Sequence, residues 1–140
     1  MHAAVDLAND EGTLAIVVNC AGIGSASRTV GRGGYETAFD LNTFRRVLEI
    51  NTIGTFDCIR IVGTAMAQEE PLEDGERGSI LNTASVAALD GQIGQAAYSA
   101  SKAGLTALGE GLQAEFAGSD ITVTVIKPGF IETDINKGVK

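Results

Sequence analysis

The sequence places a tyrosine and a lysine four positions apart, Tyr98 and Lys102, in a stretch made mostly of alanine and small polar residues. On a helix, residues at this spacing share one face. A phenol titrates near about 10, too high for an acid or base at neutral pH, but a neighbouring ammonium stabilises the phenolate. The pair therefore has the composition of a proton donor and acceptor that works at neutral pH.

Ser85 lies upstream of this pair, at the end of a stretch, GSILNTAS, that is typical of a buried strand. Its hydroxyl could donate a hydrogen bond to a carbonyl or alkoxide oxygen held near Tyr98. Taken singly, such residues more often have ordinary roles: a packing tyrosine, a solvated lysine, a serine that caps a helix. Their combination, at a strand end that faces a helix, favours a catalytic site.

Asn51 interrupts an apolar stripe that runs at helical spacing from Leu48 to Cys58. An amide buried on such a stripe needs partners for its donors and its acceptor. Two interpretations stay open at this point. Asn51 is either a packing residue that bends the helix or part of a polar relay that reaches Lys102 through water.

The candidate residues must be positioned by regular elements. Three apolar, β-branched runs predict buried strands, at residues 14–19, 78–85 and 121–127. Helical periodicity predicts two long helices, one from Phe44 to about residue 68 with Asp40 or Asn42 as its cap, and one over residues 95–117. Strands alternating with helices imply right-handed crossovers and parallel pairing. We therefore expect an α/β fold, an incomplete Rossmann-like, doubly wound parallel sheet of about three strands with long flanking helices, with the first strand buried on both faces.

In open parallel sheets, ligands bind outside the carboxyl ends of the strands. In this sequence those ends are the motif NCAG, which ends at Gly22, the motif NTAS, which ends at Ser85, and the Pro128-Gly129 pair. Glycine lets the backbone approach a ligand closely, because it has no side chain. The residues with candidate chemistry are thus expected along one edge of the sheet.

Length, charge and composition exclude several classes of protein. The 140 residues suit a single domain, and the net charge of −8 argues against a nucleic-acid partner. No apolar run is long enough to span a bilayer, so no membrane partner is expected and a cytoplasmic location follows by default. His2 is the only histidine, and no cluster has metal-ligand spacing, so neither a metal site nor a histidine-dependent triad is expected.

Four motifs together resemble the short-chain dehydrogenase/reductase family: NCAG after the first strand, Asn51 in the long helix, Ser85 ahead of YSASK, and PGFIET near the end. The sequence of these motifs is most similar to that of the family's type 2 3-hydroxyacyl-CoA dehydrogenases, and the resemblance covers residues 14–135. It implies an NAD(P)-dependent oxidoreductase that interconverts an alcohol and a ketone. A 3-hydroxyacyl-CoA is the candidate substrate and NAD the favoured cofactor, with NADP left open.

The resemblance also implies roles for individual residues. Tyr98 would be the general acid/base, Lys102 would favour its phenolate and hold the nicotinamide ribose, and Ser85 would orient the substrate carbonyl. Asn51 would support a proton relay. The residues implied at the cofactor are Asn19, Cys20, Ala21, Gly22, Tyr98, Lys102, Pro128, Phe130 and Thr133, and those implied at the substrate are Ser85, Gln92 and Tyr98.

Two segments of the family pattern have no counterpart in these 140 residues. One is the N-terminal glycine-rich turn that receives the pyrophosphate, and the other is the C-terminal part with the last strand. The alternative to an enzyme is therefore a non-catalytic, truncated fragment that self-associates and no longer binds dinucleotide. In either case the resemblance implies a homo-oligomer formed through the two long helices.

Overall fold

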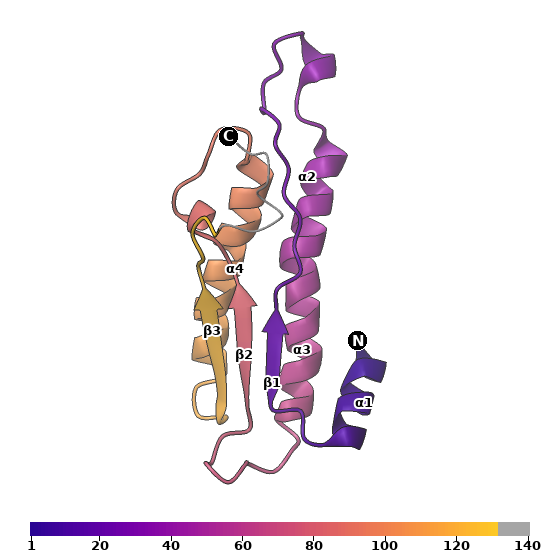
Figure 1. The fold of residues 1–140 in the computed structure, drawn as a ribbon, viewed down its shortest axis with the longest axis vertical. Helices are drawn as coiled ribbons and strands as arrows, with labels where there is room; N and C mark the ends of the chain where they lie inside the picture. Colours follow the sequence, from indigo (N-terminus) through magenta and orange to yellow (C-terminus); the bar gives the residue numbers. More distant parts are fainter. Residues whose placement is uncertain (132–140) are drawn as a thin grey trace.

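The computed structural model of the chain describes residues 1–131. Its sheet contains three parallel strands, which neighbour one another in chain order: β1 (Ile16–Asn19), β2 (Gly78–Thr83) and β3 (Ile121–Ile126) (Figure 1). Ile80 of the central strand lies opposite Val17 of β1 and Val123 of β3. The predicted α/β fold with a Rossmann-like parallel sheet is confirmed.

Long helices make both crossovers. The first crossover consists of α2 (Leu41–Leu48), a π-helical segment η2 (Glu49–Ile53) and α3 (Gly54–Met66). The second is α4 (Ala96–Glu115), and the remaining elements of residues 1–131 are α1 (His2–Glu11), which lies beside α3, and the short turns η1 (Tyr35–Thr37) and η3 (Val86–Ala88) (Figure 1). Both predicted long helices are confirmed. Within this part of the chain, no helix has the length and apolar character needed to cross a bilayer.

The first crossover helix begins at a capping carboxylate. Both Asp40 and Asn42 are suitable types for a helix cap, and the structure uses Asp40. Asp40 Oδ2 accepts hydrogen bonds from the Thr43 backbone N–H at 2.8 Å and from Thr43 Oγ1 at 2.9 Å. The backbone bond from Thr43 lowers the pKa of Asp40 from its ordinary value. The chain thereby turns from the loop after β1 into α2 at a fixed residue.

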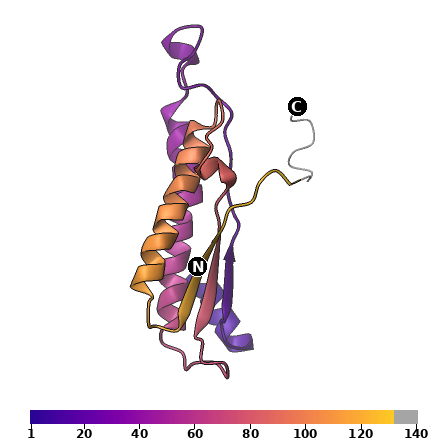
Figure 2. The ribbon, with the colours of Figure 1, turned by 90° about the vertical axis from the view of Figure 1, so that its left-hand side faces the viewer.

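The core lies on the face of the sheet that α3 and α4 cover (Figure 2). Ile80 and Ile59 are 0% exposed there, and Val17 of β1 packs against the same cluster. The residues on either side of Val17 are different: Ile16 is 67% exposed and Val18 is 56% exposed. The prediction that this first strand is buried on both faces is therefore wrong, because the two helices that pack on the sheet lie on the same face.

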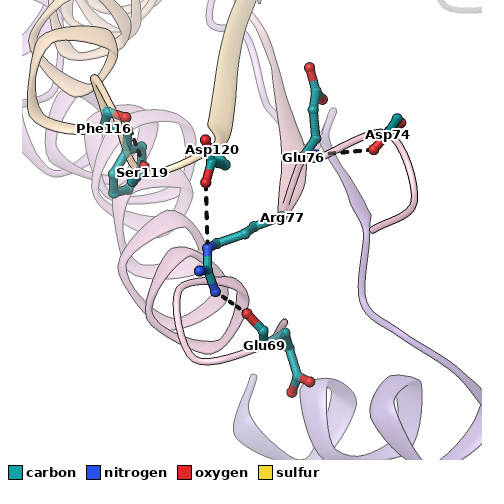
Figure 3. A network of polar contacts seen from close by, with 7 residues as sticks. All are labelled: Glu69, Asp74, Glu76, Arg77, Phe116, Ser119 and Asp120. Atoms are coloured by element: carbon teal, nitrogen blue, oxygen red, sulfur yellow. Dashed lines mark hydrogen bonds and ion pairs between the residues drawn. The ribbon is translucent and has the colours of Figure 1, made fainter. Parts of the chain in front are cut away.

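At the amino ends of β2 and β3, Arg77 joins two loops (Figure 3). Its guanidinium donates from Nη1 to the carbonyl oxygen of Glu69, and its Nε lies 3.9 Å from Asp120 Oδ2. Its backbone N–H donates to the Asp120 carbonyl oxygen at 2.7 Å. Asp120 has a φ of 61°, in the left-handed region that aspartate tolerates better than most residues. The contacts of Arg77 therefore hold the loops at this end of the sheet against each other.

Candidate active site

Tyr98 and Lys102 share one face of α4, as their spacing predicts. The Lys102 Nζ lies 5.7 Å from the centroid of the Tyr98 ring. Lys102 is only 4% exposed, and its Nζ donates a hydrogen bond of 2.7 Å to the carbonyl oxygen of Thr83, the last residue of β2. Burial lowers the pKa of Lys102 from its ordinary value. The cation is thus held between the phenol ring and the carboxyl end of the central strand.

Asn51 is 0% exposed, which confirms its predicted burial on the helix stripe. Its side-chain amide pairs with the backbone of Ile23 at two points: the Ile23 N–H donates to Oδ1 at 2.8 Å, and Nδ2 donates to the Ile23 carbonyl oxygen at 2.9 Å. Nδ2 also donates to Ser101 Oγ at 2.9 Å. The Asn51 side chain therefore pairs with the Ile23 backbone in the way that a neighbouring strand would. Through Ser101 it also joins the loop after β1 to α4.

A π turn places Asn51 in this position. Asn51 lies in the middle of η2, where the Gly54 N–H donates to the Glu49 carbonyl oxygen, five residues earlier. Such turns occur often at functional sites, because one extra residue in the turn redirects side chains and frees a backbone carbonyl. Here the Thr55 hydroxyl donates to the Asn51 carbonyl oxygen at 2.9 Å. The hydrophobic spacing of the sequence does not reveal this turn.

Gly22 brings the loop after β1 against both polar side chains. A Cβ at this position would lie 3.3 Å from Asn51 Oδ1 and 3.5 Å from Lys102 Nζ. The backbone at Gly22 therefore lies close to these two groups, and its approach to a ligand stays a prediction. Asn51 and Lys102 converge on Gly22, although the amide hydrogen bonds of Asn51 go to Ile23 and Ser101. A water-mediated relay between them stays a prediction.

Ser85 follows β2 and serves as the cap of η3, because its Oγ accepts a hydrogen bond of 3.1 Å from the Ala87 N–H. This is the ordinary role that serine has at such positions. A hydroxyl that accepts a hydrogen bond keeps its own proton for donation. The capping role therefore orients Ser85 and leaves it a donor for an oxygen outside the chain.

A model of the short chain dehydrogenase family matches residues 1–140. The chain belongs to this family. The 3-hydroxyacyl-CoA dehydrogenase type-2 of Bos taurus is 45% identical over 136 residues, which are 96% of this chain and 52% of the relative. The chain thus spans about half the length of the curated relatives it matches.

Two solved structures place this short-chain dehydrogenase chain among known folds. The crystal structure of 3-hydroxyacyl-CoA dehydrogenase type-2 from Mycobacterium avium superposes with a TM-score of 0.89 at 37% identity, covering 99% of this chain and 53% of that one. The structure of NAD+-bound xylitol dehydrogenase superposes with a TM-score of 0.78 at 28% identity, covering 96% of this chain and 47% of that one.

The remaining residues that the family resemblance implies lie at different places. Cys20, Ala21 and Gly22 are exposed after β1, whereas the Asn19 amide donates across the sheet to Asn82 Oδ1 at 2.9 Å. Gln92 and Phe130 are exposed, and Pro128 is partly buried with its carbonyl oxygen accepting from the Val86 N–H at 3.0 Å. Thr133 lies outside the described residues. Residues 19–22 thus lie at the carboxyl end of β1, Pro128 and Phe130 follow β3, and Gln92 lies between η3 and α4.

A groove of about 840 Å³ opens between the end of β1 and the η2–α3 helix. Cys20 and Ala21 line it on the strand side, and Ile53 and Phe56 line it on the helix side. The residues that line it include none of Ser85, Tyr98 and Lys102. The groove therefore includes the residues Cys20 and Ala21 that the resemblance implies at the cofactor, but none of the side chains with acid–base chemistry.

Sequence reasoning missed two buried polar residues beside the site. Asn82 is 1% exposed and accepts the hydrogen bond from Asn19, while its own Nδ2 has no partner among residues 1–131. Ser101 is 0% exposed and lies between Asn51 and Tyr98. The available signal for Asn82 was a polar residue at an inward position of an apolar strand. For Ser101 the signal was its position three residues after Tyr98, on the face that α4 turns toward Asn51.

Proposed function

We propose that the chain carries the proton-transfer machinery of an NAD(P)-dependent oxidoreductase that interconverts an alcohol and a ketone. The observation that supports this most directly is the buried Lys102 ammonium, 5.7 Å from the Tyr98 ring centroid and fixed by Thr83. A cation held beside a phenol stabilises the negative charge that develops on the phenol oxygen during proton transfer. Tyr98 is then the general acid/base of the reaction, giving its proton to a carbonyl oxygen or taking one from a hydroxyl.

Ser85 and Asn51 support this proton transfer in different ways. The Ser85 hydroxyl donates to the substrate oxygen, which stabilises the negative charge that develops there. Asn51 holds the loop at Ile23 and presents its Oδ1 toward Gly22, next to Lys102. Its proposed place in a proton relay is therefore that of a fixed acceptor near the ammonium.

The residues at the carboxyl edge fit a nicotinamide dinucleotide. The backbone of Cys20, Ala21 and Gly22 is exposed there, and the Lys102 ammonium has three donors, of which the Thr83 carbonyl takes one. These groups would hold the nicotinamide and its ribose, with Pro128 and Phe130 bordering the ring and Asn19 behind the turn. When bound, the dinucleotide supplies or accepts the hydride. We propose NAD, because the xylitol dehydrogenase neighbour was solved with NAD+ bound.

For the substrate we propose a 3-hydroxyacyl-CoA and its ketone. The support is the name of the relatives, 3-hydroxyacyl-CoA dehydrogenase type-2, which match nearly the whole chain. Within the chain, the exposed Gln92 follows Ser85 in the loop that leads to Tyr98, so it is available to contact the acyl group. Substrate contact at Gln92 stays part of the proposal.

A second candidate function is favoured by the open face of the sheet. Ile16 and Val18 of β1 are 67% and 56% exposed, and Ile126 of β3 is 42% exposed on the same face. Exposed apolar strands promote self-association. A chain that associates through such surfaces, or through α3 and α4 as we propose for the homo-oligomer, could lack dinucleotide binding. Sedimentation analysis showing a stable monomer would contradict both forms of association.

Calorimetric titration with NADH separates the two candidates. The enzyme proposal expects saturable binding, followed by oxidation of NADH when a 3-ketoacyl-CoA is added. The matched control is Lys102→Met, which keeps a long apolar side chain and removes the ammonium, and which should weaken NADH binding. A chain that shows no heat of binding up to millimolar NADH supports the non-catalytic candidate.

A further inference from the structure

Ser101 is a fully buried hydroxyl that joins the two helices of the site. It is 0% exposed, and its Oγ accepts a hydrogen bond of 2.9 Å from Asn51 Nδ2. The same Oγ donates at 2.7 Å to the carbonyl oxygen of Tyr98, three residues earlier on α4. One hydroxyl therefore connects the amide of η2 to the helical turn that carries the tyrosine.

The backbone of Ser101 makes a second connection between the same elements. Its carbonyl oxygen accepts a hydrogen bond of 3.1 Å from Thr52 Oγ1, and Thr52 is the residue after Asn51. Consecutive residues of η2 are thus bound to the side chain and the main chain of one residue of α4. Only the contact with Asn51 requires the serine hydroxyl, since the carbonyl contact with Thr52 is independent of the side chain at position 101.

The contacts of Asn51 determine which way its amide faces. The Ile23 N–H can donate only to Oδ1, and the Ile23 carbonyl oxygen can accept only from Nδ2. One hydrogen of Nδ2 goes to Ile23, and the other goes to Ser101 Oγ. Oδ1 is consequently the atom turned toward Gly22 and Lys102. Without the Ser101 hydroxyl, one buried N–H of Asn51 loses its acceptor.

We propose that Ser101 is a positioning residue, which acts through Asn51 to set the loop at Gly22 and Ile23 against Lys102 and Tyr98. The connection runs from the Ile23 backbone to the Asn51 amide, then to Ser101 Oγ and the Tyr98 carbonyl oxygen. It joins the loop after β1, the π turn and α4, which are the three elements that carry the site. Its bearing on proton transfer rests on the proposed function, whereas the positioning itself does not.

The same helix supplies a matched control. Ser99 lies two residues before Ser101, and its Oγ is also buried, yet it has no hydrogen-bond partner among residues 1–131. Ser99→Ala and Ser101→Ala delete the same atom from the same helix. Only the second deletion removes a partner of Asn51. Threonine is the conservative variant at position 101, because its hydroxyl readily bonds the carbonyl three residues earlier in a helix.

Nuclear magnetic resonance of the chain tests the proposal without any need for turnover. In Ser101→Ala we expect the Ile23 amide to exchange with solvent about tenfold faster, relative to the Ser79 amide in the central strand, because its acceptor on Asn51 is no longer held. The side-chain amide resonances of Asn51 should shift at the same time. Ser99→Ala and Ser101→Thr should leave the Ile23 exchange ratio within about threefold of the parent, because both variants keep an acceptor for Asn51 Nδ2 at position 101.

Unchanged Ile23 exchange and unchanged Asn51 resonances in Ser101→Ala would overturn the proposal, as would an equal effect from Ser99→Ala. If Ser101→Ala does not fold, the unmutated chain decides: both Asn51 side-chain protons must exchange more slowly than those of exposed Asn42, and equal rates reject the proposal. NADH turnover is a separate readout. A chain that shows these resonance changes and no turnover refutes the proposed function and leaves the positioning role standing.

Discussion

The two ends of the sheet hold their polar groups in opposite ways. At the carboxyl end, Asn51, Ser101 and Lys102 are at most 4% exposed and are bound to backbone groups or to one another. At the amino end, Arg77 and Asp120 are 28% and 52% exposed, and their charged atoms are 3.9 Å apart. A buried polar group that loses its partner costs much more than an exposed ion pair that is broken. The comparison indicates that the loss of a polar partner costs more stability at the carboxyl end than at the amino end.

The largest expected effect is on turnover at the carboxyl end. Tyr98→Phe removes the phenolic hydroxyl and should lower turnover by at least about a hundredfold, the usual contribution of a general acid/base. Folding should be intact, because no hydrogen bond of the described residues depends on that hydroxyl. The matched control is Tyr35→Phe, since Tyr35 is 100% exposed. Steady-state kinetics of both variants provides the measurement, and turnover in Tyr98→Phe within a few-fold of the parent contradicts the assignment.

The next effect is on stability, at Asn51. Leucine would suit the apolar stripe, but Asn51→Leu leaves the N–H and carbonyl of Ile23 without their partner. We expect the free energy of unfolding to fall by about 2–3 kcal/mol, the cost of buried groups left unsatisfied. Asn42→Leu changes an exposed amide of the same helical run and should cost less than about 0.5 kcal/mol. Urea unfolding measures both, and equal stability of the two variants would show that the amide pairing does not matter.

A smaller effect is expected where the loop after β1 meets the site. Gly22→Ala adds a methyl group 3.3 Å from Asn51 Oδ1, so this amide must move slightly, whereas the 3.5 Å to Lys102 Nζ is an ordinary van der Waals contact. We expect a loss of about 1 kcal/mol, at the lower end of the cost of overpacking. Gly24→Ala, where an added Cβ meets nothing within 4 Å, is the control. Thermal unfolding should show a lower midpoint only for Gly22→Ala; matching midpoints would mean that this contact is loose.

The smallest effect belongs to the amino end. Asp120→Asn removes the charge that faces Arg77 and keeps a side chain that tolerates the φ of 61°. The free energy of unfolding should change by less than about 0.5 kcal/mol, as for other exposed ion pairs. Denaturation at low and at high salt gives the measurement. A fall in the free energy of unfolding of more than about 1.5 kcal/mol would lie well outside the range of exposed ion pairs. It would mean that the amino end contributes to stability as the buried carboxyl end does.

Much of the fold follows from the sequence, because periodicity reports what each element buries. The strand and helix predictions succeeded where apolar residues recur at a regular spacing, and Asn51 was predicted to be buried because it interrupts such a stripe. The open face of β1 was not predicted. All but the last residue of IVVN are apolar, so the run has no alternation that would distinguish the exposed Ile16 and Val18 from the packed Val17.

The candidate site was only partly predictable for a different reason. The spacing of Tyr98 and Lys102 is local, and a helix fixes it. The contacts of Asn51 with Ile23 and Ser101 join residues 28 and 50 positions apart, which no local pattern encodes. The places of Gln92, Phe130 and the cofactor turn came from the family resemblance, and their roles stay proposals.

The π turn at Glu49–Ile53 also bears on how a change of length in this stretch would be tolerated. A π turn holds one residue more than an α-helical turn, so the helical segments on either side keep the faces that they would have in an uninterrupted helix one residue shorter. Deleting one residue of η2 would therefore let the winding become regular with Ile59 and Met66 of α3 still facing the core. The expected loss is at the site, because Asn51 would no longer be placed against Ile23 and Ser101. The extra residue of this helix thus serves the asparagine, whereas the packing of α3 does not depend on it.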